Sequence, residues 1–130
     1  MVDTDTFFRL LSEVCDELPD EFFKDLHHGV VLDAGSKMSP YAQNSDLWIL
    51  GEYQSGIMGN KVTVFYGSFE HLYSHLSEEQ MKNKIREVVR HEFRHHLENR
   101  AGMHGRDSLE YEDLIHLRRY MRNANQRESS

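Results

Sequence analysis

The sequence predicts a compact α+β fold, in which a small mixed β-sheet packs against one long helix and further helices lie toward both ends of the chain. Two segments, 46–54 and 61–69, are rich in β-branched and aromatic residues, and the glycines of SGIMGN between them favour a hairpin. The run GVVLDAG, residues 29–35, predicts a third strand. From Ser77 to Ala101 neither glycine nor proline interrupts the chain, which predicts the long helix.

Length and composition are those of one domain, residues 1–130. The 130 residues are 38% hydrophobic and 28% charged, which is enough apolar material for a core. The net charge of −7 gives no broad basic surface for nucleic acid, and the single cysteine, Cys15, excludes an internal disulfide and a cysteine-based zinc cluster. The start lacks a signal-peptide pattern, and no apolar run approaches about 18 residues. We therefore expect a cytoplasmic protein with neither nucleic acid nor membrane as a partner.

Two helices are predicted before the first strand. Residues 4–18 carry apolar side chains at helical spacing, with Asp5 or Thr6 as the cap. A short second helix is predicted between Pro19, which favours a helix start, and Gly29, which ends it.

The long helix has start and stop signals of its own. Ser77 and Gln80 form a capping box, and Gly102 is placed just past the helix end, where glycine is favoured. Before this helix, residues 69–76 predict one or two helical turns. The segment KMSPYAQNSD, residues 37–46, has turn chemistry throughout and predicts a loop.

After the long helix the sequence predicts one more element. A last helix is expected over residues 109–122, with Asp107 and Glu110 as a second capping box. The polar segment 123–130 is predicted to be a disordered tail.

The residues with the clearest chemistry lie in VVRHEFRHHLENRAGMHGRD, residues 88–107. His91, Glu92 and His95 follow the order H-E-x-x-H. Residues four apart lie one turn apart on one face of a helix, so His91 and His95 can direct two imidazole nitrogens at one zinc ion. Zinc lowers the pKa of a bound water to about 7, and Glu92 is placed to take the proton of that water as a general base.

The motif lies on the side of the long helix that is predicted to face the core. At about 100° per residue, His91, Glu92 and His95 continue the apolar stripe of the helix, and the arginines fall on the other side. Burying an unpaired polar group costs roughly 2–7 kcal/mol. A metal ion would satisfy all three side chains together.

The third protein ligand does not follow from the motif. A catalytic zinc takes three protein ligands and keeps one position open. The sequence leaves the third ligand open between Asp107, which ranks first, and the alternatives His104 and Glu110. Asp107 is also the expected cap of the last helix. His96, directly after the motif, is predicted to pack or to make a supporting hydrogen bond rather than to bind metal.

Several segments together resemble a known family, the small bacterial zincin-like metallopeptidases called minimal-scaffold zincins. The resemblance runs from Leu18 to Asp113 and rests on LPDEFFKDL, VVLDAG, LWILGEYQ, VTVFYGSF, VVRHEFRHHLE and RDSLEYED. It implies a compact zincin-like core with a small sheet beside the active-site helix. It also implies zinc on His91 and His95, with Glu92 as the catalytic carboxylate.

The chain departs from one pattern of that family. Some members carry H-E-x-x-H-x-x-G-x-x-D, whereas Glu98 and Ala101 stand here at the glycine and aspartate positions. Asp107 would then be a displaced equivalent of the aspartate. In zincins an edge strand beside the active-site helix binds substrate as an added β-strand, and LWILGEYQ and VTVFYGSF are both candidates. Tyr53 or Tyr66 is a candidate for assisting an oxyanion.

The leading hypothesis is therefore a zinc-dependent metallopeptidase that holds one zinc ion and acts on a peptide or protein substrate. One alternative is a metal-stabilised, non-catalytic protein-binding module. Another is a different metal-dependent hydrolase, for example one acting on nucleic acid, against which the acidic composition argues.

Overall fold

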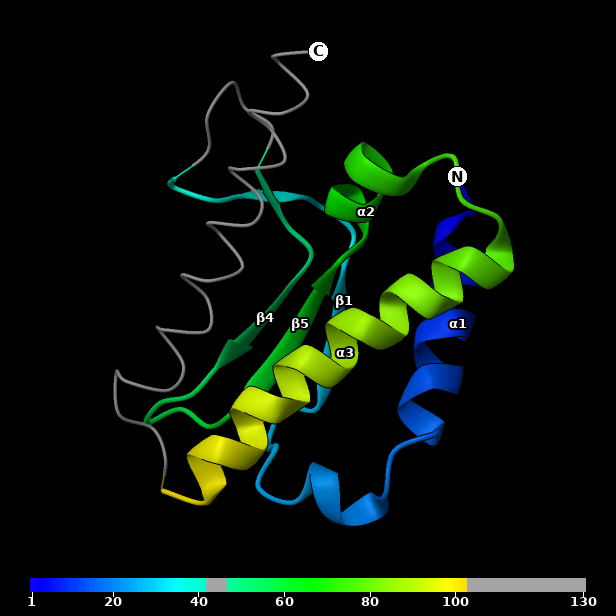
Figure 1. Ribbon diagram of the computed structural model, residues 1–130. Coiled ribbons are helices and arrows are strands. Elements are labelled where there is room, and N and C mark those ends of the chain that lie inside the picture. Colours follow the sequence, from blue (N-terminus) through cyan, green and yellow to red (C-terminus); the bar gives the residue numbers. More distant parts are fainter. Residues whose placement is uncertain (42–46, 103–130) are drawn as a thin grey trace. The chain divides into compact units, whose positions relative to one another are not determined.

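The computed structural model describes residues 1–41 and 47–102 (Figure 1). In this part of the chain helical segments come before and after a run of strands that forms two small sheets, which confirms the predicted α+β class. The chain divides into two compact units, residues 1–97 and 98–130. The account below concerns the first unit and the end of the helix that leaves it.

The main sheet has three strands in the order β1-β5-β4. β1 (Val30–Asp33) pairs with β5 (Lys61–Phe65) in parallel, and β4 (Gly51–Gln54) pairs with β5 in antiparallel. The sheet is therefore mixed, and β4 and β5 form the hairpin that the glycine-rich connection predicts.

The strand prediction for residues 46–54 needs a correction. The segment contains two strands, because β3 (Trp48–Ile49) is separate from β4 and pairs in antiparallel with β2 (Lys37–Met38) in a second, two-stranded sheet. The predicted loop 37–46 thus begins with a strand. A strand of two residues is too short to show the alternation by which strands are read from sequence.

The prediction for residues 61–69 also needs a correction, because helix α2 (Tyr66–Tyr73) begins directly after β5. The cause is a close backbone approach. The N–H of Gly67 donates to the carbonyl oxygen of Gly35 at 2.8 Å, and a Cβ on residue 67 would lie 2.7 Å from that backbone. The first turn of α2 can form there only because residue 67 is glycine.

The first two helices are shorter than predicted. Helix α1 (Thr4–Asp16) is capped by Asp3, and not by Asp5 or Thr6. The backbone N–H of Thr6 donates to Asp3 Oδ1 at 2.7 Å, which lowers the pKa of that carboxyl group. The second helix is a single 3-10 turn, η1 (Asp20–Phe23).

Helix α3 (Glu78–Arg100) is the long helix of the prediction. Its capping box is present: the N–H of Gln80 donates to Ser77 Oγ at 3.2 Å, and the N–H of Ser77 donates to Gln80 Oε1 at 3.0 Å. At the other end Gly102 has a φ of 81°, a left-handed conformation that glycine adopts without strain. Both predicted ends of the helix are confirmed.

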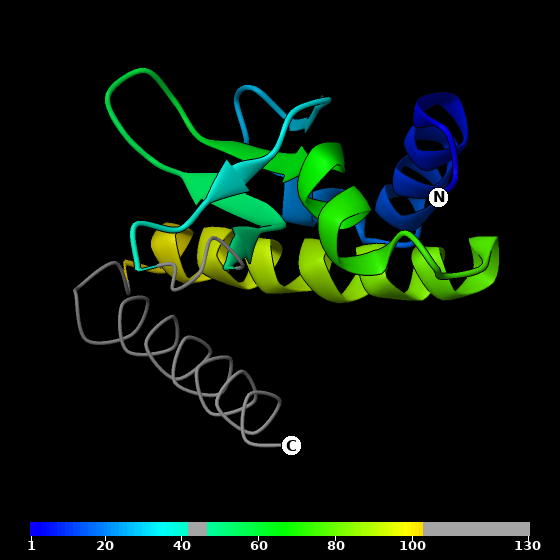
Figure 2. The same ribbon diagram turned by 90° about the horizontal axis from the view of Figure 1, so that it is seen from above.

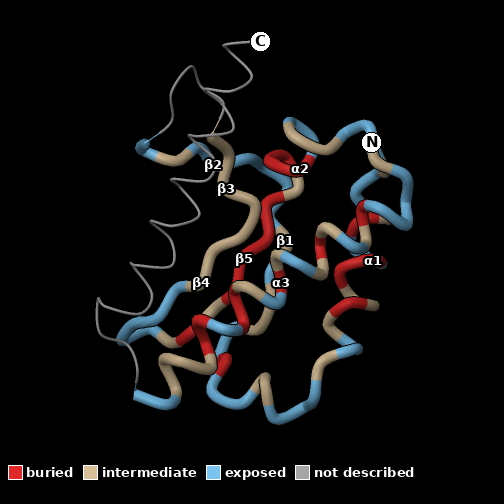
Figure 3. Tube along the Cα trace, viewed as in Figure 1, coloured by how far each residue is buried: buried red, intermediate tan, exposed pale blue. Residues whose placement is uncertain are grey.

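The core lies between α3, α1 and the main sheet. α3 crosses one face of the sheet and α1 lies alongside α3 (Figures 1 and 2). Buried residues gather on β5 and on the inner sides of the two helices (Figure 3). They include Phe7, Leu10, Leu11, Val14, Val62, Val64, Phe69, Met81, Ile85, Val89 and Phe93.

Ion pairs join α1 and the residue after it to α3. They link Arg9 to Glu78, Glu13 to Lys82, and Glu17 to Arg86. Exposed pairs of this kind contribute about 0–1 kcal/mol each, whereas burying one large apolar side chain contributes about 1.5–3 kcal/mol. The apolar contacts therefore contribute more than the ion pairs to holding the two helices together.

Cys15 packs against this core and is partly buried. Burial, together with the neighbouring charge of Asp16, raises the pKa of the thiol to about 11. The thiol is therefore protonated at neutral pH and is a weak nucleophile.

The predicted last helix (109–122), its capping residues and the predicted tail (123–130) lie outside the described residues. Within the described ranges, no helix has both the length and the apolar character needed to cross a membrane.

Candidate metal centre

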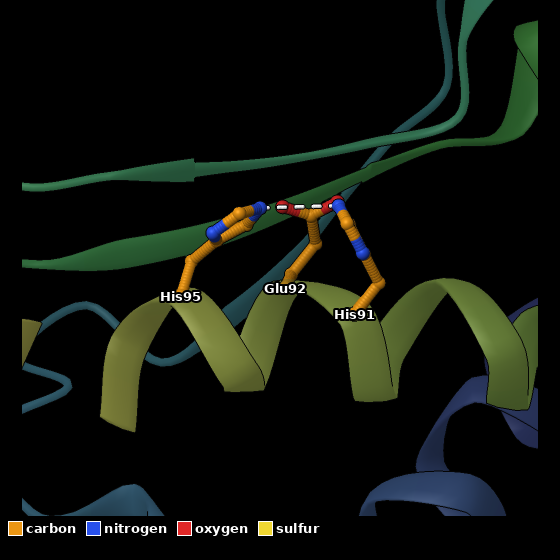
Figure 4. Close-up of side chains that lie close together, drawn as sticks. All are labelled: His91, Glu92 and His95. Atoms are coloured by element: carbon orange, nitrogen blue, oxygen red, sulfur yellow. Dashed lines mark hydrogen bonds between the residues drawn. The ribbon is translucent and has the colours of Figure 1, made fainter. Parts of the chain in front are cut away.

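Helix α3 brings the three motif residues together. The ligand atoms of His91, Glu92 and His95 all lie within 4.8 Å of one another. The three side chains project from the helix toward the strands that cross it (Figure 4). His91 Nε2 and His95 Nε2 are 3.0 Å apart, so the two imidazole rings converge on one point. This is the convergence that the four-residue spacing predicts.

The group is partly shielded from water. His95 is 5% exposed and Glu92 is 7% exposed, and His91 lies at the rim with intermediate exposure. On the same helix Arg90 and Arg94 are exposed. The predicted division of α3 into a core-facing side with the motif and an outer side with arginines is confirmed. In such surroundings the effective dielectric constant is lower than in water, so charges interact more strongly with one another.

The residues present fit a divalent zinc ion. Zinc lies about 2.0–2.1 Å from imidazole nitrogens, so two of them at tetrahedral angles are about 3.3–3.4 Å apart. The observed separation of 3.0 Å between the two Nε2 atoms is close to this value. Two imidazole nitrogens are also donors that a catalytic zinc ion takes in proteins, together with a third protein ligand.

The strand that passes over the motif is β4. At Gly51 this strand comes close to the motif, because a Cβ there would lie 3.3 Å from Glu92 Cγ and 3.5 Å from Glu92 Oε2. The sequence interpretation missed this residue, although a lone glycine inside a strand pattern is a signal of close backbone approach.

His96, the residue after the motif, is held by hydrogen bonds within the protein. It is completely buried, its Nε2 lies 2.8 Å from the carbonyl oxygen of Lys24, and its Nδ1 lies 2.8 Å from the hydroxyl of Tyr53. A carbonyl oxygen only accepts hydrogen bonds, so Nε2 carries a proton and donates. Both nitrogens are thus engaged within the protein, which agrees with the supporting role predicted for His96.

The two tyrosines considered for an oxyanion have different surroundings. Tyr53 lies on β4, and its hydroxyl contacts the ring of His96. The Tyr66 hydroxyl donates to the carbonyl oxygen of Val2 at 2.6 Å, and the ring of Tyr66 packs edge-on against Phe7. Tyr66 therefore serves the packing of α1.

The proposed third ligands lie outside the described residues. This applies to Asp107, to His104 and to Glu110, which stay predictions. Over residues 1–41 and 47–102, the one group of three or more side chains suited to a metal is His91, Glu92 and His95.

Comparison with known proteins yields a structural neighbour. No protein-family model matches the sequence, and no curated protein matches it. Among solved structures, the chain is similar to a conserved hypothetical protein from T. thermophilus, with a TM-score of 0.68 and 28% sequence identity. The similarity covers 78% of this chain and 99% of that chain. Nearly the whole of that neighbour thus has a counterpart here.

Proposed function

We propose that the protein is a zinc-dependent metallopeptidase of the minimal-scaffold zincin type. The observation that carries the proposal is the convergence of His91, Glu92 and His95 on the sheet-facing side of α3. A histidine pair that only filled space would not need a buried carboxylate within 4.8 Å. The cost of burying that carboxylate is offset when a cation is bound beside it.

Each motif residue has a separate task in this proposal. His91 and His95 hold the metal through Nε2. Zinc, when bound, supplies a Lewis acid that polarises a carbonyl group and makes water more acidic. Glu92 accepts the proton of the water that attacks the peptide carbonyl and then delivers it to the leaving amine. Asp107 remains the first candidate for completing the ligand set.

Strand β4 is the proposed binding edge for the substrate. Within the described residues β4 pairs only with β5 and is an edge of the sheet. The N–H of Phe65 donates to the carbonyl oxygen of Leu50 at 2.9 Å, so the next pair along, Gly51 with Val64, is one without hydrogen bonds. The N–H and C=O of Gly51 then point away from β5, where an extended peptide can pair with them beside Glu92.

The substrate is accordingly a peptide or an extended segment of a protein. We propose that the protein cleaves this substrate in the cytoplasm. The acidic composition and the lack of a basic stripe do not favour a hydrolase acting on nucleic acid.

The metal content of the purified protein tests the proposal first. We expect about one zinc per chain by mass spectrometry, and loss of that zinc in the double variant His91→Ala with His95→Ala. The pair His71 and His75 is a control, because these residues also stand four apart in the sequence and both are exposed. Replacing both of them by alanine should leave the zinc content unchanged.

Three results would change the assignment. Zinc that persists in the His91 and His95 double variant would place the metal elsewhere. Zinc that is bound as expected, without cleavage of any member of a peptide library, would favour the metal-stabilised binding module instead. A loss of zinc in the His71 and His75 control would place the metal at that pair instead.

A further inference from the structure

Strand β4 crosses helix α3 at an unusually short distance. A Cβ placed on Gly51 would lie 2.6 Å from Val88 Cγ1, a separation that real Cβ atoms essentially never show. The three nearest heavy atoms to that position belong to Val88 and Glu92 alone. The approach is therefore specific to one turn of α3, and that turn carries the proposed general base.

Backbone conformation does not explain the glycine. The glycines with positive φ in the described residues are Gly29, Gly59 and Gly102, and Gly51 is not among them. A residue with a side chain can adopt the backbone conformation of Gly51, and it would be more favourable in a strand, because glycine weakens a strand interior. The close contact with Val88 and Glu92 is what requires glycine here.

The strand cannot move away to make room for a side chain. On one side β4 is bonded to β5 through the hairpin ladder. Two residues after Gly51, on the same face of the strand, the Tyr53 hydroxyl is bonded to the fully buried ring of His96. His96 is fixed in turn by the carbonyl oxygen of Lys24. An added side chain at residue 51 must therefore push against the Val88 and Glu92 side chains.

We propose that Gly51 is a positioning residue for Glu92: a side chain at residue 51 would overlap Val88 Cγ1 and press on Glu92 Cγ, and its absence lets the Glu92 side chain lie under β4 with its carboxylate beside the two motif histidines. The inference rests on the proposed function for its role in catalysis. The geometric part of the inference is that residue 51 determines where the Glu92 side chain lies. That part does not depend on a bound metal.

The test uses Gly51→Ala and a matched glycine variant, Gly56→Ala. Gly56 lies in the connection between β4 and β5, and a Cβ there would meet no heavy atom within 4 Å. The first readout is the 13C chemical shift of the Glu92 carboxyl carbon in the metal-free protein, identified by its disappearance in Glu92→Gln. We expect this signal to move in Gly51→Ala and to stay in place in Gly56→Ala.

The second readout is zinc content together with turnover. Gly51→Ala should keep about one zinc per chain, because the added Cβ does not meet His91 or His95 first. Its kcat should fall by up to about 10²-fold, the loss that a misplacement of a catalytic group by roughly 1 Å would cause. KM should change much less. The strand β4 stays paired with β5, so it keeps the edge to which the substrate is proposed to bind.

A compensating variant separates misplacement from general damage. Val88→Ala removes the atom that lies 2.6 Å from the added Cβ. The double variant Gly51→Ala with Val88→Ala should therefore move the Glu92 carboxyl signal back toward its position in Val88→Ala alone and recover most of the lost turnover. This rescue also guards against a Gly51→Ala protein that does not fold.

Several outcomes would overturn the inference. One is an unmoved Glu92 signal in folded Gly51→Ala, and another is an equal displacement in Gly56→Ala. A third is a double variant without any rescue. If the wild-type protein cleaves no peptide, the proposed function fails, whereas the carboxyl signal of the metal-free protein still decides the role of Gly51.

Discussion

Replacing Glu92 by glutamine is expected to leave about one zinc per chain while lowering peptide hydrolysis by about 10²–10⁴-fold, the contribution of a positioned general base. Glutamine has nearly the same shape as glutamate, so the packing against Gly51 is retained. Its amide cannot take a proton from water near neutral pH. The measurement is kcat on the best substrate of a peptide library, with the zinc content determined on the same sample.

Glu87→Gln is the matched control for this prediction. Glu87 stands on the same helix, but its side chain is 68% exposed and pairs with Lys84 on the surface. This variant should keep both zinc and turnover. If Glu92→Gln lost its zinc together with its activity, Glu92 would be a metal ligand, and another group would have to act as the base.

Replacing Phe7 by alanine is expected to lower the free energy of unfolding by about 3–5 kcal/mol, as for other large-to-small changes of buried aromatic residues. Phe7 is completely buried and packs edge-on against the rings of Tyr66 and Phe69. Its loss would leave a cavity where α1 meets α2. Because a domain of this kind is stable by only about 5–15 kcal/mol, the effect is a large share of the total. Denaturant unfolding monitored by circular dichroism measures it.

The neighbouring residue provides the control. Phe8 is 58% exposed on the outer side of α1, so Phe8→Ala removes a side chain of the same size without opening a cavity. We expect a change within about 0.5 kcal/mol for this variant, as for most surface substitutions. Similar losses in both variants would mean that the helix propensity of α1, and not core packing, determines the stability.

The features that were predictable from sequence depend on residues a few positions apart. The capping box of Ser77 and Gln80 and the glycine at 102 gave both ends of α3, because caps act within one turn. The facing of His91 and His95 toward the sheet follows from helical periodicity alone. The cap of α1 was displaced to Asp3 since adjacent polar residues compete for the same role.

The features that were not predictable depend on contacts between distant segments. The pairing of Lys37 and Met38 with Ile49 and Trp48 has no local signature, because it is decided by where two separate segments meet. The early start of α2 depends on the space that Gly67 leaves for the backbone of Gly35. The closeness of Gly51 to Glu92 is of the same kind: the glycine is visible in the sequence, but its neighbour is not.

The parallel pairing of β1 with β5 has a consequence for the order of folding. The hairpin closes over the short connection between Gln54 and Lys61, whereas β1 ends at Asp33, much further from β5 along the chain. Closing the longer loop costs about 1.3 kcal/mol more in chain entropy, if the cost scales with the logarithm of loop length. We therefore expect the β4–β5 hairpin to form before β1 docks. Val64→Ala should then give a higher folding φ-value than Val30→Ala, and equal values would contradict this order. On this view the strand that passes over Glu92 is in place early, and the chain builds the edge proposed to bind substrate before it completes its sheet.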